Sequence, residues 1–222
     1  MLFQPTRSIA KPVFAYLFPV SVLLISPLSF AQPPQACDCL WQGSFSQITD
    51  KADLIISGKI IARKGNSADI NLDHTHFDRG INFTEFKQQI RIWGDDGKQC
   101  RPNIGDFPVG TRWVMALKKI TENKLGGFNP NTPNVSYGRI NDYYLSKCGA
   151  YWLTLNEGYV TGNLVKGRRW QWDNKKMNPV ILELIDAYIK DIIPEQALIE
   201  AAKPLTETKK LMQETKNFIH GQ

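Results

Sequence analysis

Residues 37–63 read CDCLWQGSFSQITDKADLIISGKIIAR, and two features of this stretch decide the fold. It begins with two cysteines one residue apart, Cys37 and Cys39, which cannot bond to each other without backbone strain. It ends in an isoleucine-rich run, residues 52–63, that is typical of a β-strand, with Gly58 where a bulge or bend is expected. The stretch therefore predicts a β-domain whose amino end is tied covalently to distant parts of the chain.

Two further cysteines, Cys100 and Cys148, complete the set of four. In an exported protein an even number of cysteines usually forms disulfides. With a bond between Cys37 and Cys39 set aside, two connectivities remain open: Cys37 with Cys100 and Cys39 with Cys148, or the crossed arrangement. A zinc site made of the four thiolates is the alternative, and the absence of paired CxxC spacing argues against it.

The amino-terminal segment has the parts of an export signal. Arg7 and Lys11 form a basic region, residues 12–28 are largely apolar, and Ala31 ends a stretch of small residues of the kind that a signal peptidase reads. We expect cleavage after Ala31, with cleavage after Ala36 as the alternative. The apolar run is interrupted by prolines and is short for a membrane span of about 20 residues. The mature protein is therefore expected in the periplasm or outside the cell.

Composition limits the classes of function. The chain carries 27 Lys and Arg against 21 Asp and Glu, and loss of the two basic residues of the leader lowers the net charge from +6 to +4. Such a balance is ordinary for a solvated surface, and export further argues against nucleic acid. The sequence has no Gly-x-Ser-x-Gly elbow, HExxH motif or glycine-rich phosphate loop. We therefore expect no enzyme and no cofactor.

Strand patterns dominate up to about residue 165. Residues 85–93 and 111–120 favour strands, and residues 151–164 favour a hairpin that turns at Asn156-Glu157-Gly158. Residues 123–137 are rich in Gly, Asn and Pro and are expected to form an exposed loop. Several short strands without a βαβ rhythm predict a small barrel or sandwich.

The chain changes character after residue 165. With Pro179 expected in the first turn, residues 179–193 predict a helix packed on the barrel, and residues 195–218 predict further helix beyond a break at Pro194. The apolar stripe of the first helix is expected to consist of Ile181, Leu184, Ile185, Tyr188 and Ile192.

The leader, the pair Cys37-Asp38-Cys39 and the run ADLIISGKI at residues 52–60 together resemble the opening of netrin-like domains. These domains are shared by the tissue inhibitors of metalloproteinases and their bacterial relatives. The match extends from Cys37 to Leu164 and includes FPVGTRWV at residues 107–114. The resemblance implies a mainly β fold with α, namely a five-stranded OB-type β-barrel with C-terminal helices. It also implies the disulfides Cys37–Cys100 and Cys39–Cys148.

The resemblance also implies a function. In those inhibitors the first cysteine of the pair is the mature amino terminus, and its amine and carbonyl chelate the zinc of the protease. It follows that the partner-binding edge here would comprise Cys37, Asp38, Cys39 and Leu40, with the loops around Cys100 and residues 123–137. Cleavage after Ala31 would leave residues 32–36 ahead of this edge and turn the amine into an amide. We expect a protein-binding module outside the cytoplasm, with metalloproteinase inhibition as its most concrete form.

A second candidate site lies at Arg168, Arg169, Trp170 and Trp172, which interleave cations and aromatic rings. Ion pairing and stacking at such residues can bind an anionic glycan or a lipid headgroup, and OB-type barrels often bind oligosaccharides on one face. The alternative, which we favour, is that the tryptophans cover the core while the arginines stay in water. A structural envelope protein without a ligand site is a third interpretation.

A third candidate is the segment 73–78, DHTHFD, which places His74 and His76 two residues apart. On a strand both rings would share a face and could hold a metal ion. The sequence names no third ligand, and a solvated connection between strands is the favoured interpretation, so no metal site is expected.

The predicted domain organisation has four parts. The signal peptide is expected at residues 1–31 and the netrin-like barrel at residues 32–165. A packed C-terminal helix region follows at residues 166–193, and a helical tail at residues 194–222.

Overall fold

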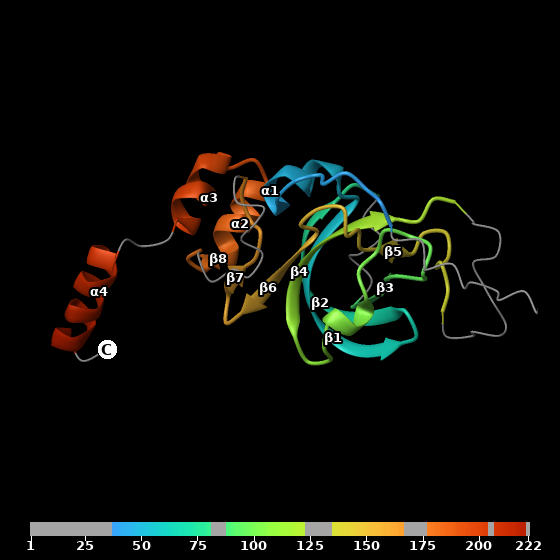
Figure 1. The fold of residues 1–222 in the computed structure, drawn as a ribbon, viewed down its shortest axis with the longest axis horizontal. Coiled ribbons are helices and arrows are strands. Elements are labelled where there is room, and N and C mark those ends of the chain that lie inside the picture. The colour runs from blue at the N-terminus through green and yellow to red at the C-terminus, as the bar shows by residue number, and fades with distance from the viewer. Residues whose placement is uncertain (1–36, 81–87, 123–134, 167–176, 204–206, 221–222) are drawn as a thin grey trace, which may run out of the picture. The chain divides into compact units, whose positions relative to one another are not determined.

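A computed structural model describes residues 37–80, 88–122, 135–166, 177–203 and 207–220 (Figure 1). The chain divides into two units, Met1–Pro33 and Pro34–Gln222, and every described residue lies in the second. The expected leader at residues 1–31 therefore lies outside the described residues, and so do both of its candidate cleavage sites.

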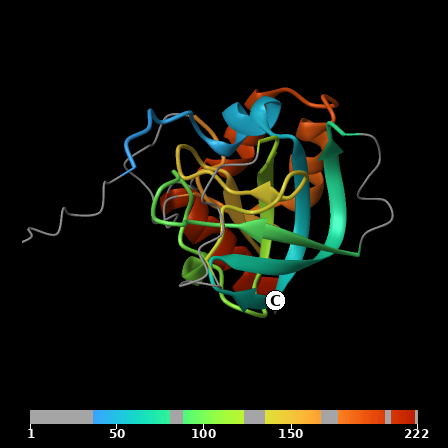
Figure 2. The ribbon, with the colours of Figure 1, turned by 90° about the vertical axis from the view of Figure 1, so that its right-hand side faces the viewer.

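Five strands close into a barrel (Figures 1 and 2). Their order is β1-β2-β3-β5-β4, and a further antiparallel pairing of β1 with β4 closes the ring. The pairing of β3 with β5 is parallel and the others are antiparallel, so the barrel is mixed. This architecture confirms the predicted five-stranded barrel with C-terminal helices. The barrel strands are β1 Leu54–Lys64, β2 Ser67–Asp78, β3 Gln89–Trp93, β4 Arg112–Lys119 and β5 Tyr143–Tyr144.

Three more strands extend the sheet from β4 in the order β6, β7 and β8. They span Trp152–Asn156, Tyr159–Thr161 and Val180–Ile181. The predicted hairpin is confirmed, because β6 and β7 pair antiparallel around Glu157 and Gly158. Both of these residues have positive φ, 48° and 81°, which suits a two-residue turn between twisted strands.

The long strand β1 is bent where the sequence predicts it. The register between β1 and β2 shifts at three places, one of them between Ser57 and Gly58. A Cβ atom at position 58 would lie 2.6 Å from the carbonyl oxygen of Asn71 and 2.6 Å from Cγ2 of Ile70. Only glycine lets the two strands approach so closely, so the predicted bulge at Gly58 is confirmed.

The interpretation of segment 73–78 as a solvated connection is wrong. These residues form the second half of β2, which pairs with β1 as far as the partners Leu54 and Asp78. The physical reason is an alternation along the strand, in which the buried side chains of Ala68, Ile70 and His76 stand two or a multiple of two residues apart. Figure 2 shows β2 as a long, curved strand.

The predicted C-terminal helix is present but shorter than expected. Helix α2 spans Leu182–Ile189 and is preceded by β8, so Pro179 lies before the helix and not in its first turn. Of the predicted stripe, Ile185 is fully buried, while Ile181 in β8 and Ile192 after the helix are 44% and 71% exposed. The chain leaves the helix through Asp191, whose φ of 56° is incompatible with helical backbone.

The remaining helices are short, apart from the last. They are α1 Phe45–Ile48, η1 Thr49–Lys51, η2 Ile104–Asp106, α3 Glu195–Ala202 and α4 Glu207–His220. Helix α3 lies beside β8 and buries Leu198 in the same core as Phe45 and Ile56 (Figure 1). The hydroxyl of Ser46 donates a hydrogen bond of 2.7 Å to Glu195, which links α1 with the start of α3.

Candidate functional site

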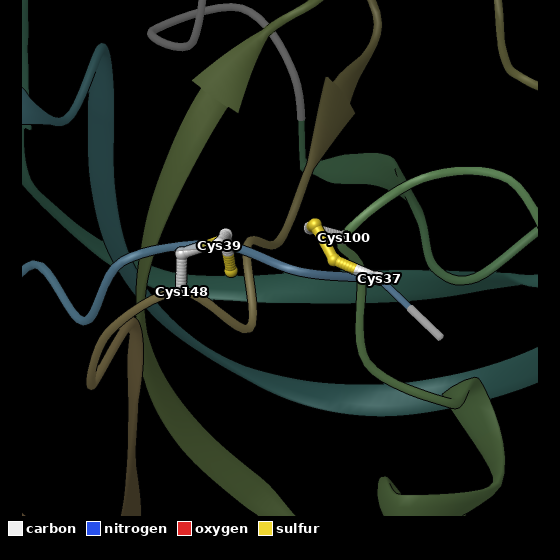
Figure 3. A group of neighbouring side chains, drawn as sticks. All are labelled: Cys37, Cys39, Cys100 and Cys148. Carbon is white, nitrogen blue, oxygen red and sulfur yellow. A yellow bond between two sulfur atoms is a disulfide. The ribbon is translucent and has the colours of Figure 1, made fainter. Parts of the chain in front are cut away.

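Two disulfides fix the amino-terminal segment to the barrel. Cys37 is bonded to Cys100 and Cys39 to Cys148, with Cα atoms 5.2 Å and 5.7 Å apart. Of the two connectivities that the spacing allows, the structure has the one that the netrin-like resemblance implies. The four sulfur atoms lie within 4.8 Å of one another, and Figure 3 shows both bonds side by side. All four sulfurs are in disulfides, so none is a thiolate that could ligate zinc.

The disulfides hold a segment without regular secondary structure, Cys37–Gln42, which we call the clamped segment. Its exposed positions are Asp38, Cys39 and Leu40, and the side chain of Leu40 is 90% exposed. Beyond Leu40, the backbone N–H of Gln42 donates a hydrogen bond of 2.6 Å to the carbonyl oxygen of Cys148. Asp38 is therefore bracketed by two disulfides, and Leu40 by a disulfide and a backbone hydrogen bond.

The clamped segment is also anchored at its end to the entry of β6. The phenol of Tyr151, whose ring is fully buried, donates a hydrogen bond to the side-chain oxygen of Gln42. Burial raises the pKa of Tyr151 to about 12. The N–H of Ala150 donates to the carbonyl oxygen of Gly43 at 3.0 Å, so backbone and side chain fix the same place.

Arg101, next to the first disulfide, contacts Tyr137 at the described end of the predicted loop. Its guanidinium carbon lies 4.3 Å and 4.4 Å from the ring centroids of Tyr137 and Tyr144, and its Nη1 donates a hydrogen bond of 2.7 Å to the carbonyl oxygen of Tyr137. Burial lowers the pKa of Arg101 from its ordinary value. The described end of the predicted loop 123–137 is thus held beside Cys100 by a buried cation between two rings.

A second feature is an open cavity of about 910 Å³ bordered by β2, β4, β6 and the start of α2. Arg112 on β4 forms an ion pair with Asp73 on β2 at its wall. Its other lining residues include His74, Thr154, Glu157 and Leu182.

Beside this cavity two histidines of β2 meet a carboxylate of α2. His76 Nδ1 is 2.8 Å from Asp186 Oδ1, and His74 Nε2 is 3.9 Å from the same oxygen. The Nζ of Lys190 donates a hydrogen bond of 2.6 Å to the other oxygen, Oδ2. The side chain of His76 is 1% exposed, that of Asp186 24% and that of His74 54%.

The protonation of this cluster follows from its surroundings. Burial lowers the pKa of His76 and outweighs its hydrogen bond to Asp186, so the imidazole is neutral near pH 7. Burial alone would raise the pKa of Asp186, but the hydrogen bonds from Lys190 and His76 outweigh it and hold that pKa below its ordinary value. The cluster therefore combines a carboxylate with a neutral, buried imidazole. Each of His74, His76 and Asp186 offers one ligand atom, and these three atoms lie within 4.8 Å of one another.

Most of the other predicted site residues are not described by the structure. Arg168, Arg169, Trp170 and Trp172 lie outside the described residues, and so do residues 123–134 of the predicted loop. Asp186 has no signal in the sequence that ties it to the histidines, because it lies 110 residues from His76 on a different element.

No protein-family model, curated protein or solved structure matches the chain. The resemblance to netrin-like domains therefore stays a prediction from the sequence. Among the described residues, no helix is both long and apolar enough to cross a membrane.

Proposed function

We propose that the protein is an extracytoplasmic binding module that recognises a protein partner through the clamped segment. The observation that carries the proposal is Leu40, a large apolar side chain that is 90% exposed on a segment fixed by covalent bonds. The two disulfides suggest an oxidising compartment outside the cytoplasm. In this proposal the protein acts either in the periplasm or outside the cell.

Rigidity gives the clamped segment an advantage in binding. A flexible loop loses conformational entropy when a partner orders it, at about 0.5–1.5 kcal/mol for each immobilised side chain. Here the backbone on both sides of Asp38 and of Leu40 is already held, by disulfides and by the hydrogen bond from Gln42. An apolar anchor on a pre-organised support is the arrangement in which few residues supply most of the binding energy.

The surroundings support the same edge. Asp38 adds an exposed carboxylate next to Leu40, which suits a partner with an apolar pocket beside a basic or metal-containing rim. Arg101 fixes Tyr137, at the described end of the predicted loop, beside Cys100. A partner would therefore meet two pre-organised pieces of chain.

Metalloproteinase inhibition is the most concrete form of the proposal. It requires a free amine at Cys37 for chelation of the protease's zinc, as in the inhibitors that the chain resembles. Mass spectrometry of the mature protein identifies its first residue. A start at Cys37 makes chelation available, whereas a start at Gln32 contradicts that mechanism.

The experiment compares inhibition of a panel of metalloproteinases by the purified, oxidised protein and by two variants. We expect Leu40→Ser to weaken inhibition about tenfold or more, since burial of a leucine contributes about 1.5–3 kcal/mol. Val109→Ser is the matched control, because Val109 is also an exposed apolar residue and lies outside the clamped segment. Absence of inhibition by the wild type contradicts the inhibitor form. Equal losses in both variants contradict the assignment of the edge.

Binding of an anionic glycan or lipid headgroup by Arg168, Arg169, Trp170 and Trp172 stays a prediction, because these residues lie outside the described part of the chain. If it holds, retention on a polyanionic polymer weakens with salt and in the variant Arg168→Ala/Arg169→Ala. Unchanged retention of that variant would contradict it.

A further inference from the structure

We propose that His74, His76 and Asp186 bind one divalent transition-metal ion of the Zn²⁺ class, with an open coordination position toward the neighbouring cavity. The site is separate from the clamped segment and is independent of the proposed partner binding. Its elements are β2, which supplies both histidines, and α2, which supplies the carboxylate.

The strand geometry brings the two imidazoles together. Residues two apart on a strand point to the same face, and the ring centroids of His74 and His76 are 4.8 Å apart. Helix α2 packs against β2 and places Asp186 Oδ1 2.8 Å from His76 Nδ1 and 3.9 Å from His74 Nε2. Ligand atoms of a tetrahedral zinc ion lie about 3.3 Å apart, given metal–ligand bonds of about 2.0–2.1 Å. The two distances lie on either side of this value, and the three ligand atoms all lie within 4.8 Å of one another.

The donor set selects the kind of metal. Two imidazole nitrogens and one carboxylate oxygen suit Zn²⁺ and related transition metals, whereas Ca²⁺ and Mg²⁺ prefer sites built from oxygen. Lys190 holds the second oxygen of Asp186 and so orients the carboxylate.

The exposure of His74 indicates that the proposed metal site is accessible from solvent. His76 is buried, but His74 is half exposed and lines the cavity of about 910 Å³. Three protein ligands leave a fourth tetrahedral position, which is typical of zinc sites that accept water or an exogenous ligand. From the side of His74 this position is reached through the cavity.

A purely structural role is the competing explanation. In that case the contact from His76 to Asp186 only fastens α2 to the barrel, and Lys190 pairs with Asp186 one turn away along the same helix. The two explanations differ in whether the oxidised protein, freed of metal and of any affinity tag, binds Zn²⁺ itself.

The experiment is calorimetric titration of that protein with Zn²⁺. We expect one saturable site per chain and at least a tenfold loss of affinity in His74→Ala and in Asp186→Asn. The chain has three histidines, so His220→Ala removes the one that the proposal does not use and is the matched control with unchanged affinity. Leu40→Ser should also bind Zn²⁺ normally, which separates failure of this proposal from failure of the proposed partner binding.

Two further measurements, of melting temperature and of Co²⁺ absorption, test the metal site independently of the titration. His74 is half exposed, so His74→Ala should fold, and Zn²⁺ should raise the melting temperature of the wild type but not of this variant. Co²⁺ should give the visible absorption bands of a tetrahedral site with nitrogen and oxygen ligands. Absence of saturable binding overturns the proposal, as does binding that survives in His74→Ala or disappears in His220→Ala.

Discussion

Tyr151 shows at the level of one residue how the core and the amino end depend on each other. Its ring is fully buried, its carbonyl oxygen accepts a hydrogen bond of 2.8 Å from the N–H of Ala116, and its phenol donates to Gln42 in the clamped segment. Ionisation of a buried phenol destabilises the folded protein, which is why burial raises the pKa of Tyr151 to about 12.

This pKa predicts a loss of stability in alkali. The contribution of Tyr151 is fully present below its unfolded pKa of about 10 and is lost as the pH rises from there toward about 12. Over that window the free energy of unfolding should fall by up to about 2.7 kcal/mol more in the wild type than in Tyr151→Phe, at 1.36 kcal/mol for each pKa unit. Urea unfolding across this pH range measures the difference.

The comparison of the wild type with Tyr151→Phe has to account for the other tyrosines. Burial also raises the pKa of Tyr143, Tyr144 and Tyr188, and these residues are present in both proteins. Tyr159→Phe is the control, because that side chain is half exposed. The same pH dependence in Tyr151→Phe and in the wild type would contradict the prediction.

At the level of elements, α2 is held to the barrel by one fully buried residue and by a polar contact. Ile185 is buried in the common core, and Asp186, next to it in the chain, contacts His76 on β2. Adjacent positions of one short helix therefore supply a hydrophobic contact and the proposed carboxylate ligand.

Truncation of the buried Ile185 should lower the free energy of unfolding more than truncation of the exposed Ile192. We expect Ile185→Ala to lower the free energy of unfolding by about 2–5 kcal/mol, because it leaves a cavity in the core. Ile192→Ala, just beyond the helix and 71% exposed, should change it by less than about 0.5 kcal/mol. Denaturant unfolding of both variants tests this, and similar costs would show that the stripe predicted from the sequence holds after all.

The sequence could predict those elements whose pattern is local. The runs that became β1, β4 and the β6–β7 hairpin carry strand signals, and Gly58 marks the bend. Strand β2 was missed, although Ala68, Ile70 and Leu72 alternate with polar residues, because the Asp and His residues that follow suggest a loop. The contact between His76 and Asp186 could not be predicted, since it depends on how α2 packs against β2.

At the level of the whole molecule, the disulfides connect the amino end with two distant loops. They close loops of 63 and 109 residues along the chain. Long loops are those whose closure most reduces the entropy of the unfolded chain.

Removal of each bond should therefore destabilise the protein strongly. Loop entropy gives about 4 kcal/mol for Cys37→Ser/Cys100→Ser and about 5 kcal/mol for Cys39→Ser/Cys148→Ser. Guanidinium unfolding measures both variants, and the slope of free energy against denaturant should increase, because the unfolded chain becomes less compact. A cost below about 1 kcal/mol for either variant would mean that its bond does not constrain the unfolded state.

The order of the cysteines along the chain has a consequence for biogenesis. A chain made from its amino end presents Cys37 and Cys39 first, then Cys100, and Cys148 last. Two thiols thus compete for the first partner to arrive, and the native bond is the one from Cys37. If Cys39 bonds to Cys100 instead, this non-native disulfide has to be rearranged by thiol–disulfide exchange once Cys148 has emerged. A disulfide isomerase would catalyse this exchange, whereas an oxidant alone supplies no thiol to carry it out.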